Sequence, residues 1–226
     1  MPTVLITGAS RGIGQAFTEG YARRGWTVWA AARTPASEAI AAIDGDVRPV
    51  ALDLGDVASI DSLPERMGWP ALDIQLNCAG LLGPTRTMQG PADTDDWPAV
   101  FQVNVIGTLR LTLSMLPLIA LGKERKIATL TSRWGSIGEN TEGGKTAYRA
   151  SKAALNAALH NMSIELADKG IVVLIITPGW VRTAMGGPDA PVSSKERAED
   201  LIALLSRLNA AHSGRFLNYD GQQLPW

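Results

Sequence analysis

The sequence predicts an α/β fold, in which a parallel sheet of seven strands is covered by helices on both faces. Short apolar runs rich in β-branched residues alternate with helical segments along the whole chain. The runs are continuously apolar, as in Ile171–Ile176, which is typical of strands buried on both faces. No repeat, charge block or low-complexity linker divides the 226 residues, so we expect a single domain over residues 1–226.

The expected elements follow one another in strict alternation. Strands are expected at Val4–Ile6, Thr27–Ala31, Val47–Leu52, Leu72–Leu76, Lys126–Thr131, Ile171–Thr177 and Arg215–Asn218. Helices are expected at Ile13–Arg24, Ser37–Ile43, Asp56–Met67, Asp95–Ile119, Thr146–Lys169 and Glu196–Asn209. Gly25 ends the first helix, as a left-handed glycine cap commonly does.

One long stretch, Ala184–Ser194, is expected to be irregular because it is too rich in glycine, proline and polar residues to continue a helix. It follows a predicted strand, and loops beyond the carboxyl ends of strands often bind ligands. We therefore expect a substrate loop at about residues 184–195. The alternative is a plain surface connection.

The composition excludes several classes of protein. Hydrophobic residues make up 46%, which argues against a disordered chain. The 21 basic and 22 acidic residues nearly cancel, so bulk charge does not favour binding to nucleic acid or to an anionic membrane. One cysteine and two histidines argue against a disulfide framework and a multi-histidine or cysteine-based metal site. The first residues lack the basic region of a signal peptide, and no apolar run reaches about 20 residues, so we expect a cytoplasmic protein.

A glycine-rich turn follows the first strand. Gly8, Gly12 and Gly14 have the spacing G-x-x-x-G-x-G between a strand and a helix. Glycine lets the backbone approach a pyrophosphate, and the helix N-terminus offers free N–H groups and a positive dipole. In this α/β context the turn predicts nucleotide binding, although three glycines can also serve a turn alone.

A candidate acid lies on the helix that begins near Thr146. Tyr148 and Lys152 are four residues apart and share one face of the helix. A phenol has an ordinary pKa of about 10, and a neighbouring ammonium favours its ionised form. Such a pair is also common on solvated helix faces. Ser132, at the end of the preceding strand, favours a catalytic role because open α/β sheets bind ligands at that edge.

Together these motifs resemble the classical short-chain dehydrogenases/reductases, and in particular their C-factor-like and carbonyl-reductase-like branch. The resemblance covers nearly the whole chain. The matching motifs are TGASRGIG at 7–14, NCAG at 77–80, Asn104 in VNV, Ser132 in SRWG, YRASK at 148–152, PGWVRT at 178–183 and the terminal GRFLNYDG. The resemblance implies a Rossmann-type doubly wound fold and NAD(P)-dependent hydride transfer between nicotinamide and a carbonyl or alcohol substrate.

The resemblance also implies a role for each matched residue. Tyr148 would be the general acid in carbonyl reduction, and Lys152 would lower its pKa and bind the nicotinamide ribose. Ser132 would hydrogen-bond the substrate oxygen, and Asn104 would hold a water that links Lys152 to solvent. Cofactor contacts would come from Gly8, Ser10, Arg11, Gly12, Ile13, Gly14, Arg33, Asp53, Leu54, Asn77, Ala79, Gly80, Tyr148, Lys152, Pro178, Gly179, Val181 and Thr183. No metal is expected.

The sequence departs from the family pattern in three places. Cys78 stands where the family usually has a second asparagine. Tyr148 follows Ser132 by 16 positions, a wider gap than usual, so the tract GENTEGG is expected to bulge into or over the pocket. Ser136 is a rival to Ser132 for the substrate-binding role, and Ser132 is preferred because it precedes the x-x-Gly of the motif. Trp134 and Trp180 flank the expected site, where they would form an aromatic wall or simply pack in the core.

The end of the second strand predicts the coenzyme. Relatives that use NAD usually have an acidic residue there, which binds the ribose 2′-hydroxyl and repels a 2′-phosphate. This chain has Ala32 followed by Arg33, and Arg11 lies in the glycine turn. Two guanidiniums without a carboxylate favour phosphate binding. We therefore expect NADP(H) to be preferred over NAD(H), unless these arginines are ordinary solvated residues.

Two further expectations concern assembly and an alternative function. The helix that carries Tyr148 is lined with small residues at Ala147, Ala150, Ala153, Ala154, Ala157 and Ala158. Small side chains allow close helix packing, and the resemblance implies a homodimer or homotetramer, whereas packing against the sheet is the alternative. The leading function is a carbonyl reductase acting on a small molecule. The competing function is a catalytically weak nucleotide-binding sensor or signalling protein.

Overall fold

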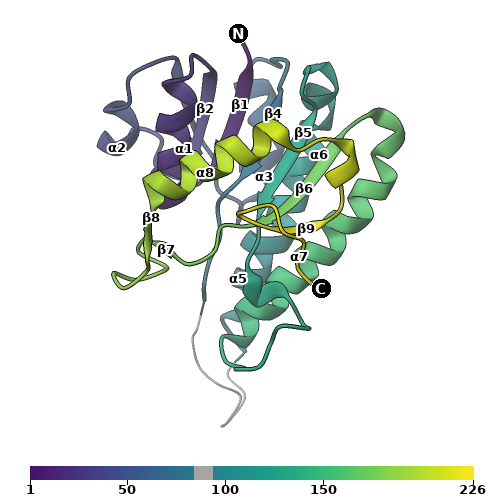
Figure 1. Ribbon diagram of the computed structural model, residues 1–226. Coiled ribbons are helices and arrows are strands. Elements are labelled where there is room, and N and C mark those ends of the chain that lie inside the picture. The colour runs from purple at the N-terminus through teal and green to yellow at the C-terminus, as the bar shows by residue number, and fades with distance from the viewer. Residues whose placement is uncertain (84–93) are drawn as a thin grey trace.

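A computed structural model describes residues 1–83 and 94–226, and it confirms the predicted parallel sheet (Figure 1). The seven strands lie in the order β3-β2-β1-β4-β5-β6-β9, and each hydrogen-bonded pair is parallel. Their bounds are β1 Thr3–Thr7, β2 Thr27–Ala32, β3 Val47–Ala51, β4 Ile74–Asn77, β5 Lys126–Leu130, β6 Val172–Thr177 and β9 Phe216–Asn218. Every expected strand is therefore present, with only small shifts at its ends.

Helices cover both faces of the sheet (Figure 1). The α-helices are α1 Gly12–Ala22, α2 Glu38–Ala41, α3 Val57–Asp61, α4 Leu63–Arg66, α5 Trp97–Phe101, α6 Thr108–Leu121, α7 Thr146–Glu165 and α8 Ser194–Arg207. On one face α1 packs against α8 and buries Phe17, whereas α6 and α7 bury Met115 and Leu159 on the other. Leu174 and Val173, adjacent in β6, belong to these two different layers. The doubly wound architecture is confirmed.

Two expected helices are interrupted, and each break has a local cause. The expected helix at 95–119 consists of α5, a π-helical turn η1 over Gln102–Gly107, and α6. A Cβ at Gly107 would lie 2.1 Å from the Leu54 carbonyl oxygen, so the helix passes unusually close to the chain after β3. The expected helix at 56–67 divides into α3 and α4, because Pro64 in the first turn of α4 has no N–H to donate.

The expected irregular stretch at 184–194 also needs correction, because it contains part of a small second sheet. Strands β7 (Val181–Arg182) and β8 (Val192–Ser193) pair in parallel. The Arg182 Nε donates to the Ala190 carbonyl at 3.2 Å and holds the returning chain beside β7. Helix α8 then begins at Ser194, two residues earlier than predicted, because Ser193 and Glu196 form a capping box. Strands this short carry too little periodicity to be predicted.

Together, α5, η1 and α6 form a helical run, Trp97–Leu121, that is long and apolar enough to pass a test for a membrane span, with a mean hydropathy of 1.5. A core helix of a globular domain passes the same test. Here Leu111, Met115 and Leu118 are fully buried in the layer that covers the sheet. Packing against the sheet therefore accounts for these three apolar residues.

A buried carboxylate joins the amino ends of three neighbouring strands. Asp73, just before β4, is 7% exposed. Its two oxygens accept hydrogen bonds from the backbone N–H of Thr3 at 2.8 Å, of Lys123 at 2.7 Å and of Glu124 at 3.3 Å. These donors lie at the start of β1 and in the turn before β5. Asp73 therefore joins these strands at their amino ends, which are opposite the ends that carry the glycine turn.

We predict that Asp73→Ala lowers the free energy of unfolding by about 1–3 kcal/mol, because three backbone N–H groups lose a charged acceptor that is itself buried. Urea unfolding of the two proteins measures the difference. Asp168→Ala is the matched control, since Asp168 is exposed in the short turn after α7. Equal unfolding midpoints for the two variants would contradict the prediction.

Candidate active site

The glycine turn connects the carboxyl end of β1 to the first residues of α1. Gly8 and Gly12 have positive φ angles of 70° and 59°, which side chains other than glycine rarely adopt. A Cβ on Gly14 would lie 2.3 Å from the Gly8 carbonyl oxygen, so only glycine fits there. No side chain caps α1, and its first turn has no acidic residue. This cradle of free N–H groups fits the pyrophosphate of a dinucleotide.

Two arginines follow the carboxyl ends of β1 and β2, where the adenosine end of a coenzyme is expected to bind. The side chains of Arg11 and Arg33 are exposed, and neither forms an ion pair within residues 1–83 and 94–226. Ala32 is buried at the end of β2 and places no carboxylate beside them. Asp53 is exposed after β3, where its Oδ1 accepts a hydrogen bond from the Gly55 N–H at 2.8 Å.

A buried acid and a buried base lie on one face of α7. Tyr148 is 7% exposed and Lys152 is 3% exposed, and the Lys152 Nζ lies 5.7 Å from the centre of the Tyr148 ring. Burial raises the pKa of Tyr148 to about 12, and its hydrogen bond with Ser132 opposes part of that rise. Burial lowers the pKa of Lys152 to about 8. The Lys152 Nζ donates to the Leu130 carbonyl at 3.0 Å, which ties α7 to the end of β5.

Ser132 lies at the end of β5, next to Tyr148. It caps the short turn η2 (Arg133–Gly135), where its Oγ accepts from the Trp134 N–H at 3.2 Å. The Trp134 ring meets Tyr148 edge-on, with ring centres 6.0 Å apart. The other expected aromatic wall residue, Trp180, is 58% exposed, and its Nε1 donates to the Gly186 carbonyl. Trp134 thus borders the candidate acid, whereas Trp180 lies on the surface.

Asn104 joins η1 to the chain after β4. Its Oδ1 accepts from the Leu81 N–H at 2.7 Å, and its Nδ2 donates to the Leu81 carbonyl at 2.8 Å and to the Ser151 Oγ at 3.0 Å. A Cβ on Gly80 would lie 3.3 Å from the Asn104 Oδ1 and 3.7 Å from the Lys152 Nζ. The structure therefore brings Asn104 and Lys152 to one point, beside Gly80. The π-helical turn that carries Asn104 is a feature often found at functional sites.

The residues of the NCAG motif have different surroundings. The Asn77 side chain is buried, and its Nδ2 donates to Thr112 and Thr129 hydroxyls, so it supports the sheet from within. The N–H groups of Cys78 and Ala79 donate to the Thr7 Oγ1 at 3.0 and 3.1 Å, which joins the ends of β1 and β4. Burial raises the pKa of the Cys78 thiol well above its usual range.

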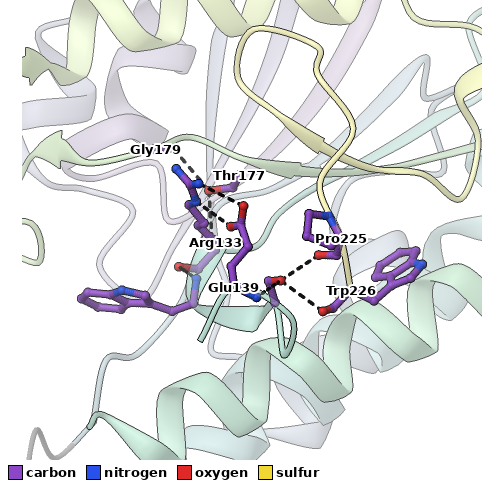
Figure 2. Close-up of polar contacts among 9 residues, drawn as sticks. Arg133, Glu139, Thr177, Gly179, Pro225 and Trp226 are labelled. Atoms are coloured by element: carbon purple, nitrogen blue, oxygen red, sulfur yellow. Dashed lines mark hydrogen bonds and ion pairs between the residues drawn. The ribbon is translucent and has the colours of Figure 1, made fainter. Parts of the chain in front are cut away.

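A threonine that the sequence analysis did not single out connects the site (Figure 2). The Thr177 Oγ1 accepts from the Arg133 N–H at 3.1 Å and from the Gly179 N–H at 3.3 Å. It thereby joins the turn after β5 to the loop after β6. The available signal was its position, as the last residue of a predicted strand and the neighbour of Pro178-Gly179.

Ser136, the rival of Ser132, is turned towards the end of the chain. Its hydroxyl lies 2.8 Å from the Pro225 carbonyl and 3.1 Å from the Trp226 carbonyl, and it accepts from the Glu139 N–H at 3.1 Å (Figure 2). Arg133 and Glu139 form an ion pair in the same turn. Ser136 therefore anchors the connection that precedes α7, and Ser132 is the serine beside Tyr148.

The tract GENTEGG, residues 138–144, lies beside the start of α7 and helps to enclose a cavity of about 300 Å³. Trp134 and Arg149 also line the cavity. The Trp134 ring contacts the Tyr148 ring as well. The extra residues between Ser132 and Tyr148 thus line a cavity that is connected with the candidate acid through Trp134.

The loop after β6 reaches back to the glycine turn. Val181 is buried in β7, and the Thr183 Oγ1 accepts from the Gly186 N–H at 3.0 Å. A Cβ on Gly12 would lie 3.3 Å from the Thr183 Cγ2, so Thr183 lies directly against the turn. The glycine turn and the loop after β6 therefore meet at the carboxyl ends of the strands, which is where open α/β sheets bind ligands.

Comparisons with known proteins agree with this geometry. The family described as short chain dehydrogenase matches residues 2–192. The C-signal protein of Myxococcus xanthus is 43% identical over 155 residues, which are 69% of this chain and 93% of that protein. The 1-hydroxy-2-glutathionyl-2-methyl-3-butene dehydrogenase of Rhodococcus is 32% identical over the full length of both chains.

Among solved structures, a carbonyl reductase from Pseudomonas aeruginosa in complex with NADP is 32% identical. Its TM-score is 0.85, and all of both chains is covered. The expected family is thus confirmed by a match that covers most of the chain. This protein belongs to the short-chain dehydrogenase family and is an oxidoreductase that acts on carbonyl or alcohol groups.

Proposed function

We propose that this enzyme is an NADP(H)-dependent carbonyl reductase. The observation that carries the proposal is the arrangement around Tyr148, a buried phenol beside Ser132 and on the same helix face as Lys152. Because burial raises the pKa of Tyr148 to about 12, its phenol keeps its proton at neutral pH. A protonated phenol is the form that a reductase needs to protonate a carbonyl oxygen.

The residues would act together as follows. When bound, NADPH supplies a hydride to the carbonyl carbon. The Ser132 hydroxyl donates a hydrogen bond to the carbonyl oxygen, and Tyr148 transfers its phenolic proton to that oxygen as negative charge develops. The Lys152 ammonium binds the nicotinamide ribose and stabilises the phenolate that remains. Asn104 holds the water through which that phenolate regains a proton.

The decisive test is Tyr148→Phe, assayed by the loss of NADPH absorbance with a panel of aldehydes, ketones and quinones. Removing a general acid typically lowers turnover by about 10²–10⁴-fold, while NADPH binding should survive. Tyr21→Phe is the matched control, since Tyr21 is a buried phenol packed against Phe17 and Trp26 within the α1 layer. Unchanged turnover in Tyr148→Phe would remove that residue from the acid role.

The pH dependence of kcat/KM should report the ionisation of Lys152. Burial lowers the pKa of Lys152 to about 8, so the ammonium is present at neutral pH and is lost as the pH rises. We predict that kcat/KM for carbonyl reduction falls as the pH rises through about 8, because kcat/KM reports the ionisation of the free enzyme. Lys152→Arg keeps its charge, so it should lose this decline even if its rate is lower. A wild-type profile that stays flat through this region would contradict the assignment.

We also propose that the coenzyme preference is for NADP(H). Exposed Arg11 and Arg33, without a carboxylate at Ala32, would form charge-assisted hydrogen bonds with a 2′-phosphate. The structural relative from Pseudomonas aeruginosa binds NADP, which supports the proposal.

Steady-state kinetics with both coenzymes test this preference. Each charged phosphate contact is worth about 1.5–3 kcal/mol, so Arg33→Ala should weaken NADPH use by about ten-fold or more. Ala32→Asp should shift the kcat/KM ratio towards NADH, because a carboxylate repels the phosphate. Arg207→Ala, an exposed arginine at the end of α8, should leave the ratio unchanged. Equal use of NADH by the wild type would refute the preference.

We propose that the enzyme forms a homodimer through α7. Of the six alanines in this helix, only Ala147 is buried, and the others keep partly or fully exposed surface that a partner helix could cover. On neighbouring η1 and α6, Ile106 and Leu113 are more than half exposed, at 53% and 57%. Light scattering at micromolar concentration should give twice the mass of the chain, and a monomeric mass would count against this interface.

A second candidate function is nucleotide-dependent signalling, which the 43% identity to C-signal favours. The same panel separates the two. Turnover that Tyr148→Phe abolishes supports the enzyme, whereas NADPH binding without turnover of any panel member supports the sensor.

A further inference from the structure

The chain between β6 and α8 forms a folded unit, which we call the flap and define as residues 178–193. Pairing of β7 with β8 closes it. Within it, the Trp180 Nε1 donates to the Gly186 carbonyl at 2.7 Å, and the Gly186 N–H donates to the Thr183 Oγ1 at 3.0 Å. A segment with this many internal bonds keeps its shape, so its position depends on how its two ends are held.

The first end of the flap rests on Tyr219, in the turn after β9. Gly179 has a φ of 72°, and a Cβ there would lie 2.9 Å from the Cδ1 and Cε1 of the Tyr219 ring. The backbone of Gly179 therefore lies in direct contact with one side of that ring. The Gly179 N–H also donates to the Thr177 Oγ1, which fixes this end to β6.

The second end of the flap leads into α8, and the same ring is contacted from there. Ser193 caps α8, and Arg197 follows in the first turns of the helix. The Arg197 guanidinium carbon lies 3.4 Å from the centre of the Tyr219 ring, which is a close cation–π contact. The stack of Arg197 on Tyr219 thus links both ends of the flap.

Arg197 is an unusual residue at this place. It is 6% exposed, and its Nε and Nη1 have no hydrogen-bond partner within residues 1–83 and 94–226. Its nearest carboxylate, on Asp200, lies 3.6 Å from Nη1 and is half exposed. Burying a guanidinium with unpaired N–H groups is unfavourable, and an apolar side chain of similar volume is often as stable or more stable. Stability alone therefore does not explain this arginine.

We propose that the Arg197–Tyr219 stack is a positioning device that holds the flap against the glycine turn and so sets coenzyme affinity. The flap carries Thr183, which lies against Gly12, and Val181. Releasing either end would move both residues away from the bound dinucleotide. Arg197 and Tyr219 need not touch the coenzyme themselves. This inference rests on the proposed use of NADPH.

The test compares NADPH affinity with thermal stability in four variants. Arg197→Met fills the same volume without the cation, and Tyr219→Leu removes the ring, so each should raise the dissociation constant for NADPH on the order of ten-fold. Tyr219→Phe keeps the ring and should bind as the wild type does. Arg207→Met, an exposed arginine of the same helix, is the matched control. The midpoint of thermal unfolding of Arg197→Met should be unchanged or higher.

A double variant, Arg197→Met with Tyr219→Leu, should bind NADPH no more weakly than either single variant, because the two substitutions remove the same contact. Unchanged affinity in Arg197→Met, or a fall in unfolding temperature that accounts for the lost affinity, would overturn the positioning role. Wild-type protein that binds neither NADPH nor NADH would overturn the proposed function, and this inference with it. Binding by the wild type with unaltered variants would overturn the inference alone.

Discussion

The candidate active site contains one buried ammonium, that of Lys152. Lys152 is almost completely enclosed, and the only acceptor that the described residues offer its Nζ is the Leu130 carbonyl at the end of β5. A buried cation is costly unless its surroundings compensate for the loss of water. Here the compensation is incomplete, because burial lowers the pKa of Lys152 to about 8. Asn104 and Gly80 lie on the same side of α7, where the Asn104 amide bonds the Leu81 backbone and the Ser151 hydroxyl.

The π-helical turn between α5 and α6 carries two close contacts with other parts of the chain. Asn104 must reach the Leu81 backbone with both atoms of its amide, while Gly107 must pass the Leu54 carbonyl without a Cβ. A regular helix with an ordinary side chain at position 107 would clash with that carbonyl. The π-helical turn therefore allows both contacts, the close packing of Gly107 against Leu54 and the hydrogen bonds of Asn104 with Leu81.

Much of this arrangement could be predicted from the sequence, because strands buried on both faces leave a strong signal. The apolar run Ile171–Ile176 predicts a buried strand, and the glycines at 8, 12 and 14 predict the turn at the carboxyl end of the first strand. The spacing of Tyr148 and Lys152 predicts that they share one helix face. The pairing of β7 with β8 was missed, since two-residue strands have no periodicity. The different surroundings of Ser132 and Ser136 could not be predicted either. They depend on where Pro225 and Trp226 lie, which is a contact between residues some ninety positions apart.

The carboxylate of Asp73 lies at the other end of the same strands, roughly 13–17 Å from their carboxyl ends for strands of four and five residues. Asp73 joins the amino ends of these strands, whereas Tyr148, Lys152 and Ser132 lie at the carboxyl ends, where Thr7 also joins β1 to β4. A substitution of Asp73 therefore alters backbone contacts that the candidate site does not share. Stability that is gained or lost at position 73 leaves those side chains in place, so the two properties can evolve separately.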